Sequence, residues 1–194
     1  MARWQTLEGS IFHTTQEGSQ EYFLKDFFEN KAFIPKTDRE KKEYEDFSFV
    51  SSAMALLIYV AQSDGVVDKE EKDMIMKELK FQLDQRHFEY ETLAEEIGPD
   101  EMKILDHLFD HFQTEIAEKA CDLNEIIRII NMIYQKNPYK RMFLVRLSYY
   151  VAYADKKFSK EEFDTIKKIA QKLRVSEADT SRIEQEVRKD LKIS

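Results

Sequence analysis

The sequence predicts an all-α protein, and three observations support this fold class. Only 4 Gly and 3 Pro occur in 194 residues, so little of the chain suits the tight turns of β-hairpins. Apolar residues recur at three- and four-residue steps, and no segment keeps the two-residue alternation of a half-buried strand. A helix–turn–helix pattern at 56–77 recurs at 147–168, which indicates a pseudo-twofold helical bundle built from two repeated helix–acidic turn–helix hairpins.

The first expected helix is the aromatic-rich segment EYFLKDFFENKAF at 21–33. It either packs on its own domain or serves as a docking arm for a partner. A capping-box pattern at 37–40 leads into a long amphipathic helix that ends at Asp64-Gly65. Further helices are predicted over 69–82, 85–96, 100–118, 122–136, 139–154, 160–173 and 177–190, with N-caps at Asp122 and Ser176.

Composition limits the class of protein and its partners. Hydrophobic residues make up 42% and charged residues 35%, which is typical of a soluble globular chain. The net charge of -8 repels phosphate backbones, so we expect no nucleic acid partner and instead expect cations and basic partners, among them other proteins. The longest apolar run, 53–61, is about half of what a membrane span needs, and no secretory signal is present, so a cytoplasmic location is expected.

The turn within each hairpin is acidic. It reads AQSDGVVDKEE at 61–71 and AYADKKFSKEE at 152–162. When 56–77 is laid over 147–168 without a gap, half of the aligned positions are identical. Either the fold needs this turn for its own stability, or the two turns hold a ligand.

A divalent metal ion is the ligand that these residues would suit. Asp64, Asp68 and Glu71 place three carboxylates in the first turn, and Asp155 and Glu162 are the matching carboxylates of the second. Hard divalent ions prefer such oxygen ligands. The pattern fits only the second half of an EF-hand loop, because the first ligand positions would fall inside a helix, so half of a cation site is predicted and an EF-hand is excluded.

The same residues also have a structural explanation. The segments 68–71 and 159–162 are capping boxes, in which the Asp or Ser159 side chain accepts from an amide and the Glu reaches back. Capping leaves Asp64 and Asp155 unexplained, because a carboxylate at a helix C-terminus opposes the helix dipole. Both explanations stay open.

The two hairpins resemble the halves of a TerB-like domain. The resemblance rests on ALLIYVAQSDGVVDKEEKDMIMKEL and LVRLSYYVAYADKKFSKEEFDTIKKIAQKLRVSEAD, and it covers roughly 47–190. This tellurite-resistance domain is also related to the N-terminal region of membrane-anchored DnaJ-type co-chaperones. The resemblance implies a TerB-like domain at 47–190 with an N-terminal helical extension at 1–46. It also implies no established catalysis, and acidic residues suspected of binding divalent metal. The second turn departs from the family pattern, because Lys156 replaces Gly65, and Lys156 and Lys157 could neutralise Asp155 without a metal.

Other candidate sites are weaker. His107 and His111 lie one helical turn apart, the spacing of helical zinc sites, but no third ligand is evident, and a solvated helix face explains them better. The single cysteine, Cys121, excludes an intramolecular disulfide. No nucleophile-elbow, phosphate-loop or dinucleotide motif occurs.

The sequence therefore favours a non-enzymatic, TerB-like module. Such a module would bind a divalent ion at its acidic turns and act as a protein-interaction unit in stress response or tellurite resistance. The alternative is a metal-free adaptor or scaffold in a chaperone or stress pathway. A metal-dependent hydrolase is the third possibility.

Overall fold

The computed structural model describes residues 38–85, 101–119, 121–155 and 158–193, and all regular structure within these ranges is helical. The predicted all-α class is confirmed. The helices are α3 (Asp38–Ala61), α4 (Lys69–Gln85), α6 (Glu101–Ala117), α7 (Leu123–Ile133), α8 (Pro138–Ala152), α9 (Lys160–Lys172) and α10 (Glu177–Asp190), with a short 3-10 turn, η2 (Gln62–Asp64), after α3. The predicted helices at 21–33 and 85–96 lie outside the described residues.

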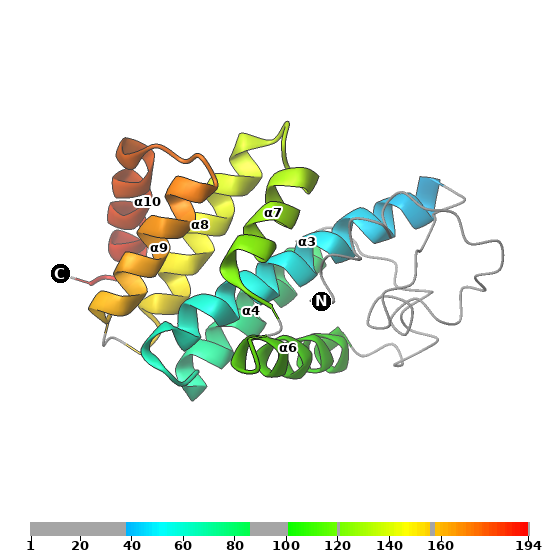
Figure 1. The fold of residues 1–194 in the computed structure, drawn as a ribbon, viewed down its shortest axis with the longest axis horizontal. Coiled ribbons are helices and arrows are strands. Elements are labelled where there is room, and N and C mark those ends of the chain that lie inside the picture. The colour runs from blue at the N-terminus through cyan, green and yellow to red at the C-terminus, as the bar shows by residue number, and fades with distance from the viewer. Residues whose placement is uncertain (1–37, 86–100, 120, 156–157, 194) are drawn as a thin grey trace.

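Helix α3 is the centre of the bundle and packs against α4, α6, α7, α8 and α9 (Figure 1). Nearly every residue from Phe49 to Ala61 is buried, including the polar Ser51 and Ser52. A helix that is apolar all round needs neighbours on every side, which the five packed helices supply. α3 continues without a break through residue 47, so the division into 1–46 and 47–190 stays a prediction.

Helix α8 has the same role in the second hairpin. It packs against α3, α4, α9 and α10, and its buried face includes Leu144, Leu147 and Tyr149. The buried hydroxyl of Ser148 donates to Leu144 O at 3.0 Å, which satisfies a polar group inside the core. α3 pairs with α4 and α8 pairs with α9, so each repeated segment forms a helix–turn–helix unit. The twofold relation between these units stays a prediction.

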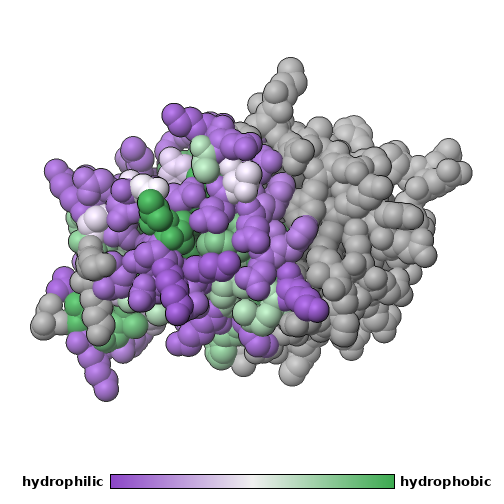
Figure 2. Space-filling model, turned by 90° about the horizontal axis from the view of Figure 1, so that it is seen from below, coloured by the Kyte–Doolittle hydropathy of each residue, from purple (hydrophilic) through white to green (hydrophobic). Residues whose placement is uncertain are grey.

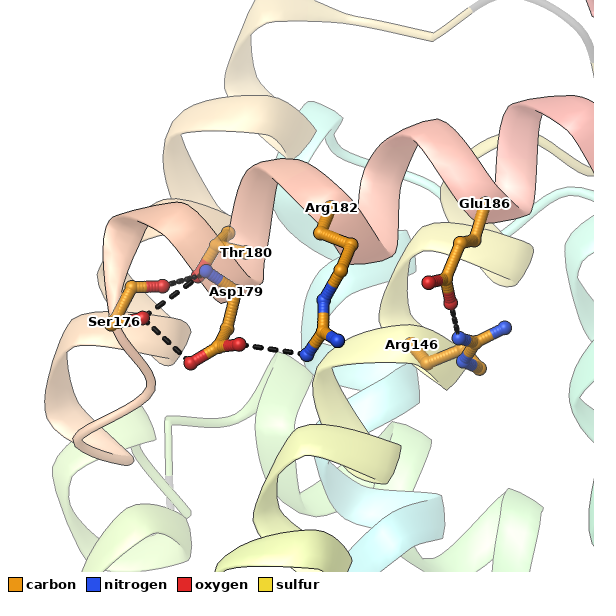
Figure 3. Close-up of polar contacts among 6 residues, drawn as sticks. All are labelled: Arg146, Ser176, Asp179, Thr180, Arg182 and Glu186. Atoms are coloured by element: carbon orange, nitrogen blue, oxygen red, sulfur yellow. Dashed lines mark hydrogen bonds and ion pairs between the residues drawn. The ribbon is translucent and has the colours of Figure 1, made fainter.

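Polar contacts fasten α10 to α8. Arg146 on α8 forms an ion pair with Glu186 on α10, and Ser176 caps the start of α10 by accepting from the Asp179 N–H at 3.1 Å (Figure 3). Tyr150 Oη also donates to Asp190 Oδ2, at 2.7 Å. The N-cap predicted at Ser176 is confirmed. The cap fixes the start of α10, and the side-chain contacts with Arg146 and Tyr150 hold α10 against α8.

The described surface is largely polar. Hydrophilic residues cover most of the coloured part of the face in Figure 2, with small hydrophobic patches between them. None of the described helices combines the length and hydropathy that crossing a membrane requires.

Candidate metal site at the paired acidic turns

The first acidic turn leaves α3 through η2. Gly65 follows with φ 126°, a backbone conformation that side chains rarely adopt, and its N–H donates to Gln62 O at 3.1 Å. This arrangement ends the helix and leaves Asp64 exposed. Val67 packs against the core, whereas Val66 is 76% exposed.

Asp68 and Glu71 form the predicted capping box at the start of α4. The Glu71 N–H donates to Asp68 Oδ1 at 2.9 Å, and the Asp68 N–H donates to Glu71 Oε2 at 2.8 Å. Glu71 is only 5% exposed, whereas Asp68 is half-buried. Capping therefore fixes one oxygen of each carboxylate.

The second turn repeats this cap with a neutral side chain. The Glu162 N–H donates to Ser159 Oγ at 3.1 Å, and the Ser159 N–H donates to Glu162 Oε2 at 2.7 Å. Glu162 is buried, with 3% of its surface exposed, and Asp155 is half-buried. Residues 156–157 lie outside the described ranges, so the neutralisation of Asp155 by these lysines stays a prediction.

The fold brings the two turns together. η2 from the first hairpin packs against α9 from the second, and the turn after α3 lies beside the start of α9 in Figure 1. The acidic side chains are near enough to influence each other's ionisation. Burial raises the pKa of Glu71 to about 8, and the charges of Asp68, Glu162 and Asp64 raise it as well.

Glu162 has a similar environment. Burial again is the main cause that raises its pKa, with Asp64 and Asp155 contributing, while hydrogen bonds from Ser159 lower it. Asp64 thus acts on the buried glutamates of both turns. The charges of the other predicted ligands thus act on Glu71, on Glu162 or on both. The closeness of acidic residues from the two turns is a tertiary feature, and it cannot be predicted from the spacing within one turn.

The chemistry of these donors fits a hard divalent cation. All are carboxylate oxygens, the ligands that Mg²⁺, Ca²⁺ and Mn²⁺ prefer. The hydroxyl of Ser63, next to Asp64, is buried and has no hydrogen-bond partner among the described residues, which leaves one more oxygen unsatisfied in the first turn. Sequence reasoning missed Ser63, because a serine inside a turn carries no signal of burial.

The carboxylates have the right chemistry for a metal ion, but they are not positioned to coordinate one together. Within the described ranges, no three or more Asp, Glu, His or Cys side chains are arranged so that they could hold a metal ion. Each buried glutamate is turned toward its own N-cap amide. Ion binding would therefore require the carboxylates to move toward one another.

The remaining sequence candidates lie on α6 and just before α7. His107 on α6 is exposed, and His111 packs edge-on against Phe112, with 5.2 Å between the ring centroids. Leu105 and Leu108 of the same helix are buried. Cys121 is buried. Burial and three nearby carboxylates raise the pKa of its thiol, which makes it unreactive.

Comparison with known families identifies the chain. The family described as tellurite resistance protein TerB matches residues 51–185, a range that includes both acidic turns. No curated protein and no solved structure matches the chain. The relation to DnaJ-type co-chaperones stays a prediction. Because the match spans well over half of the 194 residues, this chain belongs to the TerB family.

Proposed function

We propose that this TerB-family chain is a non-enzymatic module that binds a divalent metal ion between its two acidic turns, through Asp64, Asp68, Glu71, Asp155 and Glu162. One observation carries the proposal: the charges of Asp68, Glu162 and Asp64 add to the burial that raises the pKa of Glu71, and those of Asp64 and Asp155 do the same for Glu162. A bound cation would offset that repulsion, whereas below about pH 8 a proton on Glu71 does so.

The five carboxylates would have different roles. Asp64 is exposed and Asp155 is half-buried, and neither belongs to a capping box, so each can turn toward an ion without leaving a cap. Glu71 and Glu162 each have one oxygen engaged by an N-cap amide, so only the second oxygen would be offered. The ion would supply charge neutralisation between the hairpins. The proposal includes a twofold relation of the two units, which the pairing of α3 with α4 and α8 with α9 supports.

The proposed role is therefore that of a binding unit in stress response or tellurite resistance. Membership of the TerB family supports the link to tellurite resistance. The ion would stabilise the contact between the hairpins, and other proteins would bind the outer helices.

Isothermal titration of the chelator-treated full chain with Mg²⁺, Ca²⁺ and Mn²⁺ tests metal binding. We expect saturable binding that Asp64→Asn weakens at least ~10-fold, because Asp64 acts on both turns. Glu70→Gln and Glu161→Gln are the matched controls, since each removes an exposed carboxylate next to a buried one. No saturable heat with any ion, or equal losses in controls and D64N, would reject the metal site.

The metal-free adaptor is the second candidate function, and the complete capping boxes favour it. In that case the acidic turns only start α4 and α9, and partner proteins bind elsewhere. Affinity for such partners would be unchanged by D64N or by chelation. A metal-dependent hydrolase would instead require turnover that D64N abolishes.

A further inference from the structure

A groove opens between the start of α9 and the end of α10, beside the C-terminus in Figure 1. Its volume is about 980 Å³, at the upper end of the range for small-molecule and peptide pockets. Phe158, Phe163, Leu191 and Ile193 line its floor, and each is only partly buried against the core. Phe158 stacks on Tyr153, with ring centroids 4.3 Å apart, and meets Phe163 edge-on at 5.7 Å.

The first hairpin has a different side chain at the position that matches Phe163. Lys72 aligns with Phe163 in the repeat, and its ammonium lies 4.4 Å from the ring centroid of Phe109 on α6. The same ammonium is 3.4 Å from Asp106 and 3.8 Å from Asp110, so it forms ion pairs that link α4 to α6. The aromatic floor of the second hairpin is therefore not required by the repeated helix–turn–helix unit.

The rim of the groove is basic, although the whole chain has a net charge of -8. Lys160, Arg188 and Lys192 lie around the floor, and Glu184 is the carboxylate among the lining residues. Glu184 is already engaged, because Arg188 lies 3.9 Å from it and Tyr153 Oη donates to it at 3.2 Å. Lys160 and Lys192 are exposed, and no carboxylate of the described residues lies within ion-pair distance of either.

We infer that this groove binds a peptide segment of a partner protein that is amphipathic and acidic, with aromatic or leucine side chains between Asp or Glu residues. The apolar side chains would cover the Phe158–Phe163 floor, which supplies most of the binding energy in such grooves. The carboxylates would pair with Lys160 and Lys192, which sets the sign of the partner's charge. This inference does not depend on metal binding at the acidic turns.

The probe is a fluorescein-labelled helical peptide with three apolar anchors on one face and glutamates beside them. Fluorescence anisotropy with the full chain should give a Kd on the order of 10–100 µM, as expected for a single short segment. The double variant Lys160→Glu, Lys192→Glu should weaken binding at least ~10-fold, and both positions are exposed, so the fold is kept. Replacing the peptide's glutamates by glutamines should weaken it similarly.

Lys69→Glu is the matched control, because Lys69 is the exposed lysine that aligns with Lys160 in the first hairpin. It should leave the affinity unchanged. Phe163→Lys, which introduces the residue of the first hairpin, should abolish binding, with circular dichroism used to verify helix content. The inference is overturned if the peptide does not bind at millimolar chain, if K69E weakens binding as much as the rim variant, or if the chain binds anionic phosphatidylglycerol vesicles and not the peptide.

Discussion

The two acidic turns share a capping box but differ in the charge and size of the residues around it. The first cap is the carboxylate Asp68, which raises the pKa of Glu71, whereas the second is the hydroxyl of Ser159, which helps to lower the pKa of Glu162. The first turn places Val67 against the core and the second places Phe158 there. The repeat thus keeps the cap that starts each helix, and varies the surroundings that decide how readily its glutamate ionises.

The largest expected effect concerns the pH dependence of stability. The pKa of Glu71 is about 8 in the folded chain and near 4.5 when unfolded, so the folded state holds this proton more tightly. The contribution of Glu71 to the free energy of unfolding is therefore fully present below about pH 4.5. It is lost as pH rises through 8, and the loss is on the order of 3–5 kcal/mol. Glu71→Gln, which mimics the protonated acid, should remove this loss, as measured by urea unfolding at pH 5, 7 and 9.

Glu70→Gln is the control for that series, because Glu70 is exposed and its neighbour is buried. Glu162→Gln should flatten the curve less than E71Q, because the hydrogen bonds from Ser159 offset part of the burial. If the E71Q chain loses stability with pH as steeply as the unmodified chain, ionisation of Glu71 does not cause the loss. The difference described between the pKa values of Glu71 and Glu162 is then contradicted.

The second effect compares the apolar residues that anchor each turn. Phe158→Ala should lower the free energy of unfolding by about 2–3 kcal/mol, less than for a fully buried Phe because the ring is partly exposed. Val67→Ala should cost about 1 kcal/mol, because fewer methyl groups leave the core. Thermal and urea unfolding measure both. Equal costs at the two positions would contradict the unequal anchoring of the turns.

A third effect tests the backbone of the first turn. Gly65→Ala should destabilise the chain by about 1–2 kcal/mol, because a φ of 126° is strained for any residue with a Cβ. A Cβ at Gly65 would meet nothing within 4 Å, so the cost would come from the backbone alone and not from a clash. Val66→Ala, at an exposed neighbour, should change stability by less than about 0.5 kcal/mol. If the G65A chain is as stable as the unmodified chain, the turn can adopt another backbone conformation without cost.

The smallest effect on stability comes from exchanging the caps. Asp68→Ser introduces the cap of the second turn and should change the free energy of unfolding by less than about 0.5 kcal/mol, because Ser and Asp cap equally well. It should nevertheless lower the pKa of Glu71, since one nearby negative charge is removed. A carbon-detected NMR titration of the Glu71 carboxyl measures the change. Asp68→Ala, which loses the cap, should cost about 1 kcal/mol, and an unchanged Glu71 pKa in D68S would contradict the role given to Asp68.

Local signals in the sequence predicted much of the fold. Both capping boxes and the N-caps at Asp122 and Ser176 are where the patterns placed them. Helix ends were less accurate. α7 ends at Ile133 although the pattern continues to 136, and Asn137, which caps α8 by accepting from Lys140 N–H at 3.1 Å, was not recognised beside Pro138. Helix ends depend on which competing hydrogen bonds the packed chain satisfies, and a residue pattern does not record that choice.

The sequence by itself determined the helical class, the repeat and the identity of the acidic residues, because the residue order within each short segment is enough to recognise them. Only the tertiary structure decided that the two turns lie against each other, that Glu71 and Glu162 are both buried and that Asp64 acts on each of them. It also decided that Lys72 pairs with Asp106 on α6, whereas Phe163, at the matching position of the second hairpin, lines the groove beside α9. Burial and Coulomb interactions depend on distance in space, and segments far apart in the sequence become neighbours only when the helices pack.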